Sequence, residues 1–105
     1  MSTLSELIPT LLEKTNEGKI EWQQLSAATF VARVGAASLE VGRNRNNVDY
    51  LVLRNEVGDA LEQTDYNLLP SGLDQQLRAL YERAHRKALR LDETIEDLKK
   101  RLKEL

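Results

Sequence analysis

The chain has 105 residues, of which 41% are hydrophobic and 30% are charged, and its formal net charge is −2. This composition is typical of one globular domain and excludes a disordered chain. No apolar run approaches the roughly 18 residues that a membrane-spanning helix needs. The absence of cysteine excludes disulfides, thiol catalysis and thiolate metal sites. The first residues carry no signal-peptide pattern, so we expect a cytoplasmic protein without membrane contact.

The first expected element is a helix near the start of the chain. Thr3 and Glu6 have the spacing of a capping box. Apolar residues then recur at helical intervals, at Leu4, Leu7, Ile8, Leu11 and Leu12. Pro9 is unfavourable inside a helix, so either the helix kinks there or Pro9 lies in its first turn. Asn16 and Gly18 are expected to end the helix.

The middle of the chain predicts an antiparallel meander of three or four strands. A short extended segment at residues 19–23 contains Trp22, the only tryptophan, which we expect to anchor the core. Alternating or continuous apolar residues predict strands at 29–34, 38–43, 48–54 and 60–64. The strand at 48–54 is the most apolar and is the candidate for the centre of the sheet.

Residues 73–105 contain no glycine or proline and predict one long amphipathic helix. Two apolar rows each repeat every seven residues and lie on one stripe of that helix. The first row is Leu77, Ala84, Leu91, Leu98 and Leu105, and the second is Tyr81, Ala88, Ile95 and Leu102. Such a helix would be about 50 Å long, whereas a compact domain of this size is about 30 Å across. Its far end should therefore overhang the domain.

An overhanging apolar stripe needs a cover, and a second copy of the same helix is the simplest one. Ile at a and Leu at d favour a parallel two-stranded coiled coil, in which Lys87 faces Asp92 of the partner subunit. The expected interface consists of Tyr81, Ala88, Leu91, Ile95, Leu98 and Leu102. The alternative is a helix that breaks near Leu91, with Asp92 as a new N-cap and the last turns folded back onto the sheet.

These elements predict an α+β domain with an N-terminal helix, an antiparallel sheet of three to four strands and a long C-terminal helix. Residues 1–72 supply the first helix and the sheet. Residues 73–105 supply the long helix of the same single domain.

Three parts of the sequence carry a resemblance that spans most of the chain. They are residues 11–15 with 18–22, the hairpin at 50–59, and the helical stretch at 77–89. These parts are similar to a family of small, uncharacterised bacterial α+β domains with no established activity. The resemblance implies a bacterial, intracellular module and adds no catalytic residue.

The sequence offers little for catalysis or metal binding. His85 is the only histidine, and Arg83, Arg86 and Lys87 lie close to it in the sequence. Positive neighbours lower the basicity of an imidazole, so we expect a solvated surface histidine and no general base. Glu82 and His85 have the Glu-x-x-His spacing of carboxylate-bridged metal sites, but such a site needs further ligands. The glycines form no phosphate-binding pattern. We therefore predict no catalytic residue, cofactor or metal, and no enzyme activity.

The most distinctive polar feature is a basic patch on one face of the predicted C-terminal helix. It consists of Arg83, Arg86, Lys87 and Arg90. Arg43 and Arg45, in a polar loop, could extend it. Such a patch can contact phosphate backbones, but the acidic balance and the 5% aromatic content are atypical of nucleic-acid binders. A salt-bridged surface and an acidic protein partner are the other interpretations.

The leading prediction is a non-enzymatic protein-interaction or assembly module. It would act through its C-terminal helix, as a homodimer or with a partner protein's helix. The alternative prediction is a nucleic-acid-binding accessory protein that uses the basic patch.

Overall fold

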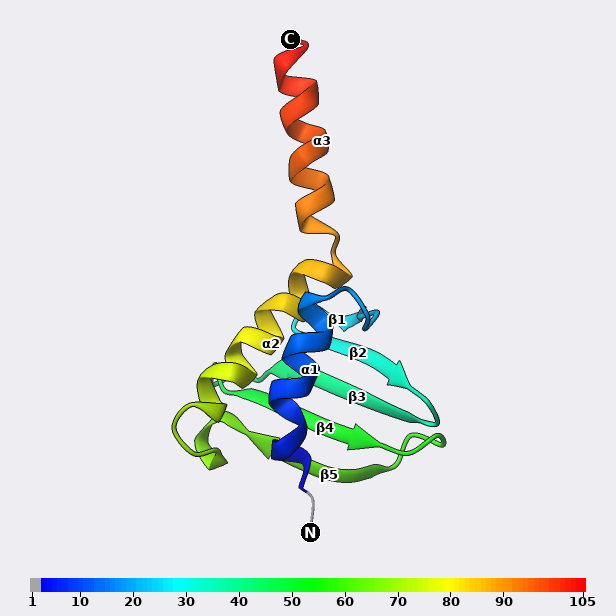
Figure 1. Cartoon of the computed structure of the whole chain (residues 1–105), viewed down its shortest axis with the longest axis vertical. Coiled ribbons are helices and arrows are strands. Elements are labelled where there is room, and N and C mark those ends of the chain that lie inside the picture. Colours follow the sequence, from blue (N-terminus) through cyan, green and yellow to red (C-terminus); the bar gives the residue numbers. More distant parts are fainter. Residues whose placement is uncertain (1–2) are drawn as a thin grey trace.

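The computed structural model describes residues 3–105, and Figure 1 shows the order of their elements. A 3₁₀ turn, η1 (Leu4–Leu7), leads into helix α1 (Ile8–Asn16). The strands are β1 (Gln23–Ser26), β2 (Thr29–Val34), β3 (Ala37–Arg43), β4 (Asp49–Arg54) and β5 (Ala60–Asp65). A second 3₁₀ turn, η2 (Tyr66–Leu68), precedes helices α2 (Leu73–Ala88) and α3 (Leu91–Lys103).

The five strands form one antiparallel meander in the order β1-β2-β3-β4-β5. This confirms the α+β class and the N-terminal helix, but the prediction of three to four strands was one strand short. The additional strand, β1, follows the extended segment expected at residues 19–23. All four of its residues are exposed, so β1 is held by its backbone pairing with β2 and shows no apolar alternation.

The start of the first helix differs from the capping-box prediction. The Thr3 hydroxyl lies 2.9 Å from the Ser5 hydroxyl and caps no backbone N–H. The Leu4 N–H instead donates to the Glu62 carboxylate of β5 at 3.0 Å. Pro9 lies in the first turn of α1, as one of the two alternatives predicted, because a first-turn residue needs no N–H donor. The N-terminal segment is therefore tied to the edge of the sheet.

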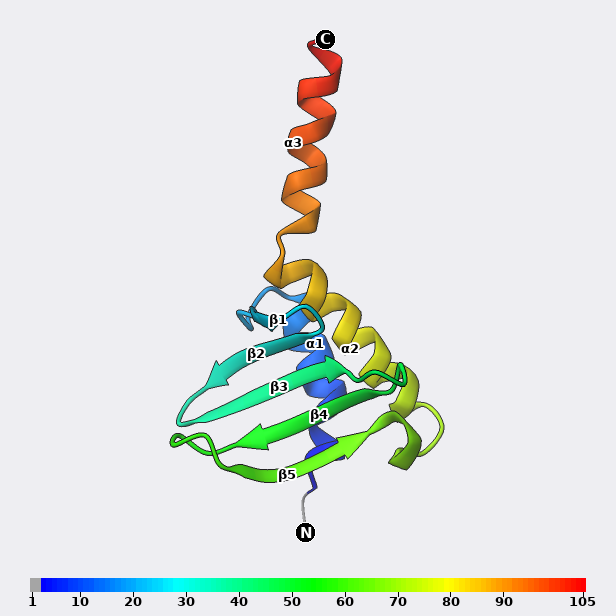
Figure 2. The same cartoon turned by 180° about the vertical axis from the view of Figure 1, so that it is seen from behind.

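Helices α1 and α2 cover one face of the sheet, in front in Figure 1 and behind in Figure 2. The core between the layers includes Phe30, Leu39, Val41 and Leu51 from the strands and Leu4, Ile8, Leu77, Leu80 and Ala84 from the helical side. Trp22 is buried and donates its Nε1–H to the hydroxyl of Thr15 at 3.0 Å. This confirms that Trp22 anchors the core.

On the opposite face of the sheet, polar side chains of neighbouring strands contact one another. Tyr50 lies over Gly42, where an added Cβ would be 2.5 Å from the Tyr50 hydroxyl oxygen. That hydroxyl lies 3.2 Å from the Thr29 hydroxyl and donates to Glu40 at 3.2 Å. Burial raises the pKa of Tyr50 above its ordinary value. An added Cβ at Gly42 would also lie 2.9 Å from the Ala28 carbonyl oxygen, so the Tyr50 ring and the backbone together favour glycine at this position.

The C-terminal stretch is two helices, so the prediction of one continuous helix was wrong. Arg90 has φ 53° and ψ 41°, the left-handed conformation, and separates α2 from α3. This break is the one that the alternative placed near Leu91, although Arg90 and not Asp92 occupies the N-cap position. The last turns do not fold back onto the sheet. Helix α3 buries no residue and projects from the domain (Figures 1 and 2). With α3 included, the longest dimension of the molecule is 57 Å.

Candidate functional site

The most prominent surface feature is an apolar stripe along α3, which we call the α3 stripe. It consists of Leu91, Ile95, Leu98, Leu102 and Leu105. Alternating steps of four and three residues place these side chains on one side of the helix. Leu91 is partly buried, whereas Ile95, Leu98 and Leu102 are 44%, 50% and 66% exposed. Beyond Leu91, the apolar side chains of the stripe are exposed to solvent.

The six residues predicted for a partner interface fall into two groups. Tyr81 is only 8% exposed and belongs to the core, and Ala88 packs partly against that core. The other four lie on the α3 stripe. Before Arg90, the residues of both apolar rows lie over the sheet. After Arg90, the residues of both rows lie on α3, which extends into solvent. Tyr81 therefore offers a partner only the small part of its surface that lines a hollow beside Leu91, and the interface stays a prediction.

The charges of α3 are divided along its length. Its first half carries Asp92, Glu93, Glu96 and Asp97, and its second half carries Lys99, Lys100, Arg101 and Lys103. This division suits the helix macrodipole, since acidic groups are favourable near an N-terminus and basic groups near a C-terminus. Within the helix Glu96 pairs with Lys99 at 3.5 Å and Asp97 with Arg101 at 2.9 Å. Such exposed pairs stabilise a helix by only a few tenths of a kcal/mol, so these charges remain able to pair elsewhere.

One ion pair connects α2 to α3 across the break. The Arg86 guanidinium donates to the Asp92 carboxylate at 2.5 Å and holds the pKa of that carboxyl below its usual range. Asp92 is therefore engaged within its own chain. Lys87, its expected partner across a parallel dimer, is exposed and lies on α2, before the break at Arg90.

The predicted basic patch is present only in part. Arg83, Lys87 and Arg90 are exposed, and within residues 3–105 they form no ion pair. Arg86 is paired with Asp92. Arg43 does not extend the patch, because it is bound to a buried carboxylate. Three free cations therefore remain on the solvent side of the α2 end.

The buried carboxylate is Asp49, which sequence reasoning missed. It is fully buried and accepts hydrogen bonds from Arg43 Nε at 2.6 Å and from Arg78 Nε at 3.2 Å. The bond to Asp49 raises the pKa of Arg43, whose guanidinium also lies 4.4 Å from the centre of the Tyr81 ring. The sequence feature that could have indicated this buried carboxylate is an aspartate within an otherwise apolar strand. This cluster connects β3, β4 and α2, and all its charges are paired.

His85 is not the solvated surface residue that the sequence suggested. Its ring meets Phe30 edge-on at 5.3 Å between ring centroids, and its buried Nδ1 has no hydrogen-bond partner. Successive helical residues are rotated by about 100°, so the neighbouring arginines face other directions. Glu82 is exposed. Residues 3–105 contain no group of three His, Asp or Glu side chains that could hold a metal ion.

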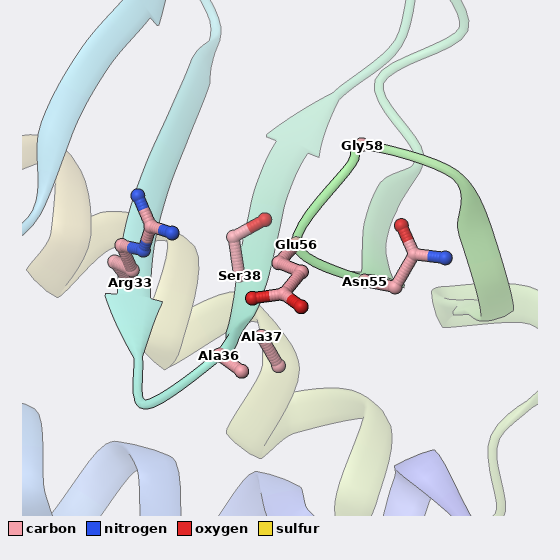
Figure 3. Close-up of a pocket in the computed structure, with 7 residues that line it drawn as sticks. All are labelled: Arg33, Ala36, Ala37, Ser38, Asn55, Glu56 and Gly58. Atoms are coloured by element: carbon pink, nitrogen blue, oxygen red, sulfur yellow. The ribbon is translucent and has the colours of Figure 1, made fainter.

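Among the hollows on the surface, one lies between two hairpin turns and another at the base of α3. Figure 3 shows one between the β2–β3 and β4–β5 turns, where Arg33, Ser38 and Glu56 are among the lining residues. Its volume of about 110 Å³ is below the 300–1,000 Å³ of typical ligand pockets. A second hollow, of about 380 Å³, lies at the base of α3, where Tyr81, His85 and Leu91 contribute to its lining. Its two arginines, Arg43 and Arg86, are already paired with carboxylates.

Comparisons of this chain with protein families, with characterised proteins and with solved structures find no match. No helix within residues 3–105 combines the length and apolar character that crossing a membrane requires.

Proposed function

We propose that this protein is a non-enzymatic interaction or assembly module that associates through the α3 stripe, first of all with a second copy of itself. The observation that supports the proposal is that a 13-residue helix with regularly spaced leucine and isoleucine has no fully buried residue, and that Ile95, Leu98 and Leu102 are exposed. A free helix of this length is marginal in water. Packing of its apolar side on another helix would stabilise it and cover the stripe.

The expected stabilisation can be estimated from two residues in the middle of the stripe. Full burial of an exposed Leu or Ile side chain stabilises by about 1.5–3 kcal/mol. Ile95 and Leu98 are 44% and 50% exposed, so each would gain about 1 kcal/mol. Four such side chains in a homodimer contribute about 4 kcal/mol, which is about a thousandfold in the dissociation constant.

The test is the molar mass of the full chain, measured by light scattering after size exclusion over a range of concentrations. The wild-type protein should form a dimer. The double variant Ile95→Gln/Leu98→Gln should be monomeric at the same concentrations, with an unchanged near-ultraviolet spectrum of Trp22. The matched control, Glu93→Gln/Lys100→Gln, lies on the opposite side of α3, adds the same two amides and keeps the net charge; it should remain dimeric. A monomeric wild type, or a dimeric stripe variant, would contradict self-association.

The second candidate function is nucleic-acid binding through the basic patch, and it is supported by the three unpaired cations Arg83, Lys87 and Arg90. Three phosphate contacts would reduce the affinity for duplex DNA about 40-fold between 50 and 200 mM salt. Fluorescence anisotropy with a labelled duplex measures this, and Arg83→Gln/Lys87→Gln should flatten the salt dependence. The absence of binding at 50 mM salt would remove this candidate.

A further inference from the structure

We propose that α3 pairs with α3 of a second copy in the antiparallel direction, with Leu91 opposite Leu102 of the partner subunit and Ile95 opposite Leu98 of the partner subunit. This inference rests on the proposed function and specifies the partner, direction and register of the contact. It replaces the parallel pairing expected from the sequence.

The division of charge along α3 favours the antiparallel direction. The four acidic residues of its first half, Asp92 to Asp97, would lie along the four basic residues of the partner's second half, Lys99 to Lys103. The twofold axis repeats this match at the other end. A parallel pair instead places acidic halves side by side and basic halves side by side, which is unfavourable at short range.

The charged residues beside the stripe also favour the antiparallel direction. In the proposed register Asp92 lies next to Lys99 of the partner subunit, and the symmetry of the dimer makes this pair twice. The parallel register relied on Lys87 and Asp92, but Arg90 breaks the helix between them and Asp92 already accepts a hydrogen bond from Arg86. Within α3, the parallel register offers one flanking contact in place of this ion pair. Thr94 lies next to Lys99 of the partner subunit, because these two positions border the apolar interface of a parallel pair.

Charge also selects the register among antiparallel pairings. Shifting the helices by one heptad would place Ile95 opposite Leu105 of the partner subunit and would still bury apolar residues. It would also bring Lys99 next to Lys99 of the partner subunit, and Arg101 next to Arg101 of the partner subunit. Like charges across an interface are destabilising, so we select the register that pairs Asp92 with Lys99.

The shape of the molecule agrees with this direction. Helix α3 rises from near the middle of the width of the domain (Figures 1 and 2), and the two shorter dimensions of the molecule are 31 and 27 Å. Packed helices lie only about 8–10 Å apart, so a parallel pair would bring two wide domains together at the same end. An antiparallel pair places the domains at opposite ends.

The hollow at the base of α3 adds contact area in this arrangement. Leu91 both begins the α3 stripe and lines the hollow of about 380 Å³. Because Leu91 would lie opposite Leu102 of the partner subunit, the last turn of the partner's helix would reach this hollow. Tyr81 and His85, whose ring centroids lie 6.3 Å apart, are among the residues that line it and would contact an incoming aliphatic side chain. The parallel arrangement would leave the hollow uncovered.

The natural absence of cysteine allows a direct test with the full chain. Leu91→Cys and Leu102→Cys are prepared separately, one with a tag that changes its mass, then mixed reduced and oxidised. In the antiparallel register the two cysteines face each other, and the mixed disulfide should exceed either self-disulfide at least tenfold. Identical cysteines would be offset by eleven residues, about 16 Å along the helix, whereas a disulfide needs Cα atoms within about 7 Å.

Molar mass in reducing buffer separates failure of this inference from failure of the proposed function. Dimers that form only self-disulfides would keep the assembly function and overturn the antiparallel direction. Dimers that form no disulfide would overturn this register. A monomeric wild-type protein would overturn both proposals. If either cysteine variant loses the dimer, Ile95→Cys and Leu98→Cys repeat the test at the adjacent layer, where the mixed disulfide should again dominate.

Discussion

Replacing Asp49 by alanine removes the carboxylate that joins β4 to β3 and α2. Asp49 is fully buried, and its two oxygens accept hydrogen bonds from Arg43 at 2.6 Å and from Arg78 at 3.2 Å. In the alanine variant both guanidinium groups lose their acceptor. We expect the free energy of unfolding to fall, because charges that are partly removed from water are left without a partner.

The magnitude follows from how much water the two arginines already meet. Removing one partner of a fully buried ion pair typically costs about 3–5 kcal/mol. The side chains of Arg43 and Arg78 are 29% and 41% exposed, so they recover part of their hydration, and we expect a loss of about 2 kcal/mol. Asp49→Asn should lose about 1 kcal/mol, because its amide oxygen still accepts one hydrogen bond.

Urea unfolding followed by Trp22 fluorescence measures these losses, and the midpoint of Asp49→Ala should fall by about 1 M. Asp59→Ala is the matched control, since Asp59 is exposed in the β4–β5 turn; its change should stay within about 0.5 kcal/mol. Adding Arg78→Ala to Asp49→Ala should cost less than the sum of the two single changes. Equal losses for Asp49→Ala and Asp59→Ala would refute the reasoning about the buried cluster.

Three further predictions test the break, the ion pair across it and the covered glycine. Arg90→Gly should preserve stability or raise it by about 1 kcal/mol, because glycine adopts the left-handed conformation freely; a loss of about 1 kcal/mol, as expected inside a continuous helix, would contradict the break. Arg86→Gln should raise the pKa of Asp92 towards its ordinary value in a ¹³C carboxyl NMR titration, since the hydrogen bond from Arg86 is the main cause of the lowered pKa; an unchanged pKa would argue against that bond. Gly42→Ala should cost about 2 kcal/mol in urea unfolding through its clash with Tyr50, and less when combined with Tyr50→Ala; strictly additive losses would mean that the two residues do not touch.

Most strands could be predicted because their apolar residues report which face is buried. The strand expected at residues 29–34 has those bounds in the structure, and the one expected at 38–43 differs from β3 by one residue. Strand β1 could not be found in this way, because all of its residues are exposed. It is held by backbone hydrogen bonds to β2. Such bonds do not require apolar side chains, so the sequence shows no hydrophobic alternation there.

The polar interior was also beyond a sequence-based prediction. From the sequence, Arg43 could extend a surface patch, yet it is bound to Asp49, a residue six positions later on the neighbouring strand. Arg78 reaches the same carboxylate from a helix 29 positions away. His85 packs against Phe30 from the opposite layer. In each case the partner is brought near by the packing of helix on sheet, and no local spacing encodes it.

For the candidate interface, the sequence alone determined that apolar residues would follow one side of the C-terminal helical stretch, since a repeat of seven residues permits no other arrangement on a helix. It also determined the separation of acidic from basic residues along α3. Only the tertiary structure decided where the stripe stops being core. Leu77, Tyr81 and Ala84 lie over the sheet and are buried. The α3 stripe begins after Arg90, whose left-handed conformation could not be predicted because no glycine or proline lies near it in the sequence. The sheet ends where α2 ends, so the same repeat stabilises the fold before the break and remains free for a partner after it.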